Sequence, residues 1–121
     1  MTIRRVVPAL ASADLQASAD FYSELLGLKA VMDHGWIVTL ADPEHPERQL
    51  SLASGDASAA VAPDVSIEVD DVDHAHHLAN QMGAEIVHPL TDEPWGVRRF
   101  FVKSPDGHIL NILGHPESRT S

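Results

Sequence analysis

A repeat dominates this sequence. Two stretches, residues 6–31 and 65–87, carry the same order of a strand, an acidic residue, an amphipathic helix, a glycine and a second strand. A repeat of this length indicates two equivalent supersecondary units, each of which leaves one sheet face uncovered. The sequence therefore predicts paired modules with a concave sheet face, which is a natural place for a small molecule.

Turn residues set the limits of the modules within what we expect to be a single domain over residues 1–121. Module one covers about residues 3–54, a linker rich in Gly, Ala and Ser covers about 55–63, and module two covers about 64–114. Helical spacing after the capping residues Asp14 and Asp71 predicts the buried positions. These are Leu15, Ala19, Tyr22 and Leu26 in the first helix, and Val72, Ala75, Leu78 or Ala79, and Met82 in the second.

Composition excludes several classes of function. A formal net charge of −10 disfavours nucleic acid and anionic membrane surfaces as partners. No apolar run is long enough to span a membrane and the N-terminus lacks a signal-like apolar region, so we expect a cytoplasmic protein. Because the chain has no cysteine, a metal site would need His, Asp or Glu.

Alternation in the second module predicts which strand residues face the concave side. Val65, Ile67 and Val69 alternate with polar residues, so the apolar set is expected to face the helix layer. Arg98 and Arg99 are adjacent, so at most one of them points to the concave side. The residues expected there are Asp64, Ser66, Glu68, Ile109, Asn111 and Leu113.

Several segments together resemble the vicinal oxygen chelate superfamily, which includes glyoxalase I, extradiol dioxygenases, fosfomycin-resistance enzymes and bleomycin-resistance proteins. The resemblance rests on residues 7–10, 14–22, 25–27, 94–96 and 104–108, in the family's order. It implies an α+β fold of two βαβββ modules that form a curved mixed-sheet cup (the glyoxalase/bleomycin-resistance/dioxygenase fold). It also implies a homodimer.

The resemblance locates four places that hold metal ligands in the family's metal enzymes. In this sequence Val7, Asp64 and Asn111 match the first, third and fourth places, and Gln49 or Ser51 matches the second. Valine cannot bind a metal, and neutral amide or hydroxyl oxygens bind divalent transition metals poorly. On one strand Asp64 and Glu68 lie roughly 13 Å apart, too far for one ion. We therefore expect no metal and no cofactor.

Histidines offer a weaker alternative. His74 and His77 are neighbours on the second predicted helix, but a metal site needs a third ligand close by. We expect them to be surface residues.

The segment 93–96 contains Trp95 between a proline and a glycine. Two interpretations stay open: the indole closes the end of the sheet, or it stacks on a flat or cationic ligand. This segment resembles the bleomycin-resistance branch, whose members bind a cationic glycopeptide without metal ligands of their own. The expected ligand-binding residues are Val7, Trp36, Ser51, Asp64, Ser66, Glu68, Trp95, Arg99, Phe101 and Asn111.

The leading hypothesis is a metal-independent binding protein that sequesters a small cationic or aromatic molecule, as in antibiotic resistance. Two enzyme hypotheses stand beside it. One is a lyase, isomerase or dioxygenase with a metal held by a ligand set that includes Asp64. The other is a metal-free enzyme in which Asp64 or Glu68 is a general base.

Overall fold

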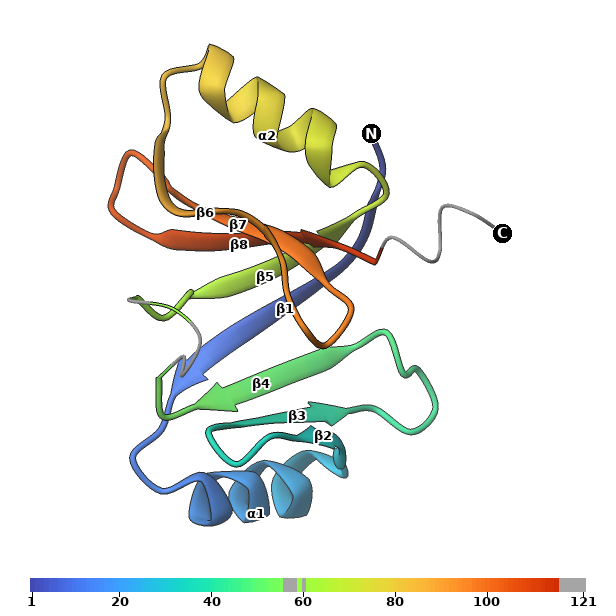
Figure 1. The fold of residues 1–121 in the computed structure, drawn as a ribbon. Helices are drawn as coiled ribbons and strands as arrows, with labels where there is room; N and C mark the ends of the chain where they lie inside the picture. The colour runs from blue at the N-terminus through green and yellow to red at the C-terminus, as the bar shows by residue number, and fades with distance from the viewer. Residues whose placement is uncertain (56–58, 60, 116–121) are drawn as a thin grey trace. The chain divides into compact units, whose positions relative to one another are not determined.

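The computed structural model describes residues 1–55, 59 and 61–115. The chain divides into two compact units (Figure 1): Val7–Ala62, called the N-terminal unit, and Pro63–Ser121 together with Met1–Val6, called the C-terminal unit. Both modules have the predicted order of elements, strand, helix and three strands. The elements are β1(Ile3–Ala11), α1(Leu15–Leu26), β2(Lys29–Asp33), β3(Ile37–Ala41), β4(Gln49–Ala53), β5(Val65–Val69), α2(Val72–Gln81), β6(Glu85–Asp92), β7(Arg98–Lys103) and β8(Ile109–Gly114).

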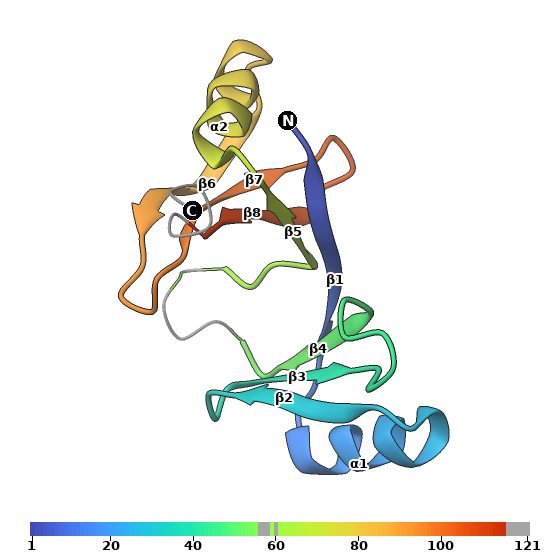
Figure 2. The same cartoon turned by 90° about the vertical axis from the view of Figure 1, so that its right-hand side faces the viewer.

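The N-terminal unit is a mixed sheet in the order β2-β3-β4-β1, covered on one face by α1 (Figure 2). Strand β4 runs parallel to β1 and antiparallel to β3. Leu40 and Leu52 are almost fully buried, and Leu15, Ala19 and Tyr22 of α1 pack against them, as the helical spacing predicted. This apolar contact leaves the other face of the sheet to the alternate residues of β3 and β4.

The prediction that Leu26 is buried was wrong, since it is 61% exposed. Leu26 is the last residue of α1, and Gly27 follows it with a left-handed φ of 72°. A glycine adopts this conformation without steric cost and turns the chain back toward the sheet. Leu28 then packs against the core in place of Leu26.

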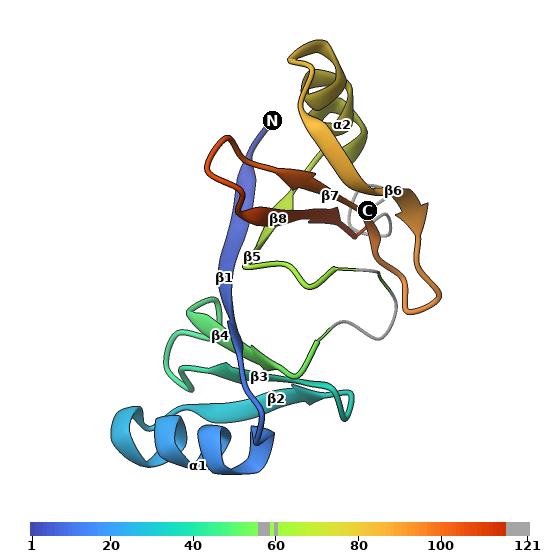
Figure 3. The same cartoon turned by 90° about the vertical axis from the view of Figure 1, so that its left-hand side faces the viewer.

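The C-terminal unit is a mixed sheet in the order β1-β5-β8-β7-β6, with α2 on one face (Figure 3). Strands β5 and β8 are parallel, whereas β7 is antiparallel to both of its neighbours. Phe100, Val72 and Val69 form the buried centre beneath α2. Ile67 and Ile112 pack against the same cluster, which identifies the faces of β5 and β8 that point toward the helix.

The end of α2 also departs from the sequence prediction. Ala79 is buried as expected, but Met82 is 80% exposed. Helix α2 ends at Gln81, and Gly83 takes a positive φ of 70°. Ala84 and Ile86, which lie beyond the glycine, pack against the core instead. In both modules, residues beyond the glycine therefore complete the core in place of the last predicted helix position.

The start of β1 is tied to the C-terminal unit. The backbone N–H of Thr2 donates to Asp70 Oδ1 at 2.8 Å, and the backbone N–H of Asp70 donates to the Thr2 carbonyl at 3.0 Å. The hydrogen bond from Thr2 lowers the pKa of the Asp70 carboxyl. These bonds hold the first residues of the chain against the end of β5.

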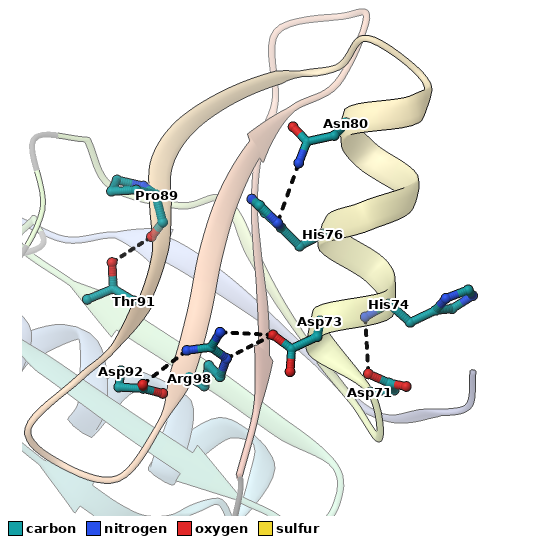
Figure 4. Close-up of polar contacts among 9 residues, drawn as sticks. All are labelled: Asp71, Asp73, His74, His76, Asn80, Pro89, Thr91, Asp92 and Arg98. Carbon is teal, nitrogen blue, oxygen red and sulfur yellow. Dashed lines mark hydrogen bonds and ion pairs between the residues drawn. The ribbon is translucent and has the colours of Figure 1, made fainter.

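Arg98 joins α2 to the edge of the sheet (Figure 4). Its guanidinium donates to Asp73 at 3.0 Å and to Asp92 at 3.0 Å. The two carboxylates raise the pKa of Arg98. Arg98 thus lies on the α2 side of β7, and its neighbour Arg99 must point to the other side.

Within the described residues, no helix has the length and apolar character needed to cross a membrane.

The core of the C-terminal unit generates a matched pair of variants, one at the buried Phe100 and one at the exposed Met82. Phe100→Ala should destabilise the protein by about 3–5 kcal/mol, because it removes a buried ring and leaves a cavity. Met82→Ala should change the free energy of unfolding by about 0.5 kcal/mol or less, because Met82 is exposed. Urea unfolding followed by circular dichroism measures both. A loss of more than 2 kcal/mol in the Met82 variant, on the order of a core truncation, would contradict this assignment of the core.

Candidate functional site

The candidate site is the face of the C-terminal sheet that points away from α2. Ile67, Phe100 and Ile112 face the helix. The residues beside them in sequence therefore face the opposite side. Five of the ten residues expected to bind ligand lie on this face: Ser66, Glu68, Arg99, Phe101 and Asn111. A sixth, Trp95, lies in the loop just beyond β6.

One row of this face crosses four strands. Ser66 pairs with Asn111, Asn111 with Phe101, and Phe101 with His88. Asn111 Nδ2 donates to Ser66 Oγ at 3.0 Å, and the rings of Phe101 and His88 are 4.8 Å apart between centroids. Phe101 has no exposed surface and Asn111 is only 8% exposed. The row is therefore a buried aromatic centre with a polar group on either side.

Arg99 and Glu93 form a buried ion pair next to this row. Arg99 Nε and Nη2 both donate to Glu93 Oε2, at 2.8 and 2.7 Å, and the two side chains are 5% and 7% exposed. The Arg99 guanidinium also lies over the rings of Trp95, at 5.1 Å, and Phe101, at 4.7 Å. Trp95 itself is 46% exposed. Trp95 is therefore a partly exposed aromatic beside a buried cation, and both interpretations of it stay open.

Glu68 is held in a second ion pair. Arg5 of β1 donates to Glu68 Oε1 at 2.6 Å, and His115 Nδ1 lies 3.1 Å from Glu68 Oε2. The Glu68 side chain is 13% exposed. Glu68 and Glu93 therefore each have an arginine partner.

Asp64 has a structural role just before the start of β5. Its Oδ2 accepts from the backbone N–H of Ile109 at 2.8 Å, and His108 Nδ1 lies 3.9 Å away. The Asp64 side chain is 57% exposed. This arrangement joins the start of β5 to the start of β8.

The remaining expected residues, Val7, Trp36 and Ser51, belong to the N-terminal unit. Ser51 pairs with Thr39 through their hydroxyl groups at 2.8 Å, on the face away from α1, and both are buried. Val7 is also buried. Trp36 precedes β3, and its carbonyl accepts from Ser54.

The strand registers relate the two modules residue by residue. Ser51 pairs with Ala9 of β1, and Asn111 pairs with Ser66 of β5. Ser51 is therefore the repeat counterpart of Asn111, and Val7, two residues before Ala9, is the counterpart of Asp64. Between the two candidates for the second family place, the repeat selects Ser51 over Gln49.

These donors do not fit a metal ion. Val7 has no donor atom, the Ser51 hydroxyl is hydrogen-bonded to Thr39, and Asn111 offers only a neutral amide oxygen, which binds divalent transition metals poorly. Among the described residues, no three His, Asp or Glu side chains are grouped so that they could hold one. Two histidines of α2 have other surroundings. His74 points away from the strands (Figure 4), and His76 packs edge-on against Phe100.

Four residues of this face were missed by sequence reasoning: Arg5, His88, Glu93 and His115. Glu93 lies in the loop that carries Trp95, where an acid two residues before a stacking tryptophan was the available signal. For His88 the alternation of side chains along the strand is misleading. Ile86 faces α2, so simple alternation would put His88 on that side as well, but a β-bulge between them turns it toward Phe101.

Two buried atoms of this face have no hydrogen-bond partner among the described residues: His88 Nε2 and Asn111 Oδ1. The nearest acidic oxygen to His88 Nε2 is Glu93 Oε2 at 3.9 Å, beyond hydrogen-bond length. An unsatisfied buried polar atom costs about 1–3 kcal/mol. Native proteins keep few of them, and those that persist often mark a bound water, a ligand or a chemical role.

The fold and the sequence now identify the family. Residues 3–112 match the family model described as Glyoxalase/Bleomycin resistance protein/Dioxygenase superfamily. The chain belongs to this superfamily. The resemblance seen in the sequence and the α+β fold of paired βαβββ modules are thereby confirmed.

Known relatives span nearly all of the chain. The protein YwbC of Bacillus subtilis strain 168 is 29% identical over 111 residues, which cover 83% of this chain and 88% of YwbC. A superfamily member from Vibrio splendidus 12B01 is 20% identical with a TM-score of 0.70, over 93% of this chain and 98% of its own. A methylmalonyl-CoA epimerase from Streptomyces coelicolor is 16% identical with a TM-score of 0.67, over 93% and 98%. At these identities the two structures show the fold alone.

The contrast between the ion pairs of Glu93 and Asp92 can be tested by charge removal. Glu93→Gln should destabilise the protein by about 3–5 kcal/mol, because it leaves the buried Arg99 without its carboxylate. Asp92→Asn breaks a pair in which the aspartate side chain is 71% exposed, so it should cost about 1 kcal/mol or less. Chemical denaturation of both variants measures the difference. Equal effects would show that the Glu93–Arg99 pair is solvated in solution.

Proposed function

We propose that this protein is a metal-independent binding protein that captures a small cationic or aromatic molecule. The observation that carries the proposal is the state of the acidic side chains on the candidate face. Glu93 is paired with Arg99 beside the buried Phe101, Glu68 is paired with Arg5, and Asp64 accepts from a backbone N–H. A face whose carboxylates are occupied in this way offers aromatic and hydrogen-bonding surface rather than a ligand set for an ion.

In this proposal the aromatic contact comes from Trp95, a residue that is 46% exposed. Stacking on an indole suits flat rings and flat cations. The net charge of −10 favours the approach of a cation. Capture of a toxic aromatic compound in the cytoplasm, as in antibiotic resistance, is the biological role that we propose for such binding.

A second candidate is a metal-free acid–base enzyme. The observation in its favour is His88, whose Nε2 is buried 3.9 Å from a Glu93 oxygen. A histidine beside a carboxylate is a common arrangement for proton transfer. Asp64 and Glu68, the bases expected from the sequence, are less suited because each already accepts a hydrogen bond from its partner.

The binding proposal is tested with chelator-treated protein. We expect ethidium, a planar cation, to bind with the same affinity before and after EDTA treatment, as measured by isothermal titration calorimetry. Trp95→Ala should weaken binding several-fold, since stacking of a cation on an indole contributes about 1 kcal/mol. The control Met82→Ala removes another exposed apolar side chain, after α2 and outside the candidate face, and should bind as the unmodified protein does. Loss of binding with EDTA, restored by one divalent metal, would overturn the proposal.

A homodimer, expected from the sequence, remains a prediction. It is supported by three large apolar side chains on α1, namely Phe21, Leu25 and Leu26, each more than half exposed. Sedimentation velocity at micromolar concentration should show a dimer, and Leu25→Asp should shift it toward monomer. Met82→Asp places the same charge on another exposed apolar residue and should leave the dimer intact. A monomeric unmodified protein would refute the prediction.

A further inference from the structure

The two unsatisfied atoms of the candidate face lie in the same row of the sheet. Asn111 and His88 both pair with Phe101, one from β8 and one from β6. Their Cα atoms are thus two strand spacings apart, roughly 10 Å. Asn111 Oδ1 and His88 Nε2 therefore stand on either side of a fully buried phenyl ring.

The chain supplies no partner for either atom among the described residues. Asn111 uses Nδ2 for Ser66, which leaves its oxygen as an acceptor only. His88 Nε2, in a neutral imidazole, either donates or accepts, according to the tautomer. A ligand that satisfies both atoms therefore needs a hydrogen-bond donor near Asn111 Oδ1. It also needs a group such as a hydroxyl, which can donate or accept, near His88 Nε2.

The charges next to the row limit the ligand further. Arg99 is paired with Glu93 at 2.7 Å, and Glu68 with Arg5 at 2.6 Å. A charged group brought between these pairs would lose its hydration and find no uncompensated countercharge, which is unfavourable. An uncharged molecule avoids this cost.

We propose that the row formed by Asn111, Phe101 and His88 binds a neutral, planar heteroaromatic molecule. A ring N–H of the ligand donates to Asn111 Oδ1, a hydroxyl at the opposite end bonds His88 Nε2, and the ring system lies against Phe101. This inference rests on the proposed binding function and selects its aromatic form over the cationic one. Because the Phe101 ring and both atoms are covered by protein in the structure, binding requires the side chains that cover them to rotate away.

The test uses three probes of similar shape, titrated by calorimetry into the full chain. 5-Hydroxyindole carries both polar groups, 1-methyl-5-hydroxyindole lacks the N–H, and indole lacks the hydroxyl. We expect 5-hydroxyindole to bind about tenfold more tightly than either analogue, because each analogue leaves one buried atom unsatisfied. The ¹⁵N resonances of the His88 imidazole should shift with 5-hydroxyindole and not with indole.

Two substitutions locate the contact. Asn111→Leu keeps the approximate side-chain shape and removes the acceptor, so it should abolish the preference for 5-hydroxyindole over its N-methyl analogue. Asn80→Leu changes the other asparagine of the chain, which is exposed on α2, and should keep the preference. The probe comparison in the unmodified protein remains decisive even if Asn111→Leu does not fold.

The outcomes separate this inference from the proposed function. Equal affinity for the three indoles, or a preference that survives Asn111→Leu, would overturn the inference, with the two buried atoms then bridged by water only. Ethidium binding without metal would leave the proposed function standing in that case. If neither ethidium nor any indole binds, the proposed function fails and the inference fails with it.

Discussion

The structure depends on one strand that is buried on both faces. Phe100 and Phe101 are consecutive in β7, with 1% and 0% of their surface exposed. Because side chains alternate along a strand, Phe100 packs beneath α2 and Phe101 lies on the opposite face. The pairing of β7 with β6 and β8 then sets the face of every neighbouring residue. The hydrophobic core and the candidate site are therefore two sides of the same strand.

Charge pairing gives the candidate face its chemical character. The chain is strongly acidic, yet the glutamates of this face each lie against an arginine. A buried carboxylate without a partner would be costly, so the pairing allows these acids to lie within the sheet unit. The excess negative charge of the chain is carried elsewhere, where it acts on approach and solubility rather than on close contacts.

The family resemblance bears on four positions that hold metal ligands in related enzymes. Superfamily membership is shown over residues 3–112. The sequence resemblance implies that the places of the family's metal ligands fall at Val7, at Gln49 or Ser51, at Asp64 and at Asn111. The internal repeat relates Val7 to Asp64 and Ser51 to Asn111. The side-chain amide of Asn111 can still form hydrogen bonds from β8. It lacks the negative charge of a carboxylate, which attracts a cation.

The sequence by itself determined the repeat, the order of elements and which side chains of β5 and β8 point toward the helix, because each follows from local spacing. It left open which of Arg98 and Arg99 points away from α2. It misplaced Leu26 and Met82, since the glycine after each helix returns the chain to the core earlier than periodicity indicates. Only the tertiary structure decided that His88 joins the site. Its direction depends on a β-bulge, and a bulge is a property of hydrogen bonding between two strands, which the residues of one strand do not encode. The same holds for Arg5 and Glu68, 63 residues apart in sequence, which meet only because β1 lies beside β5.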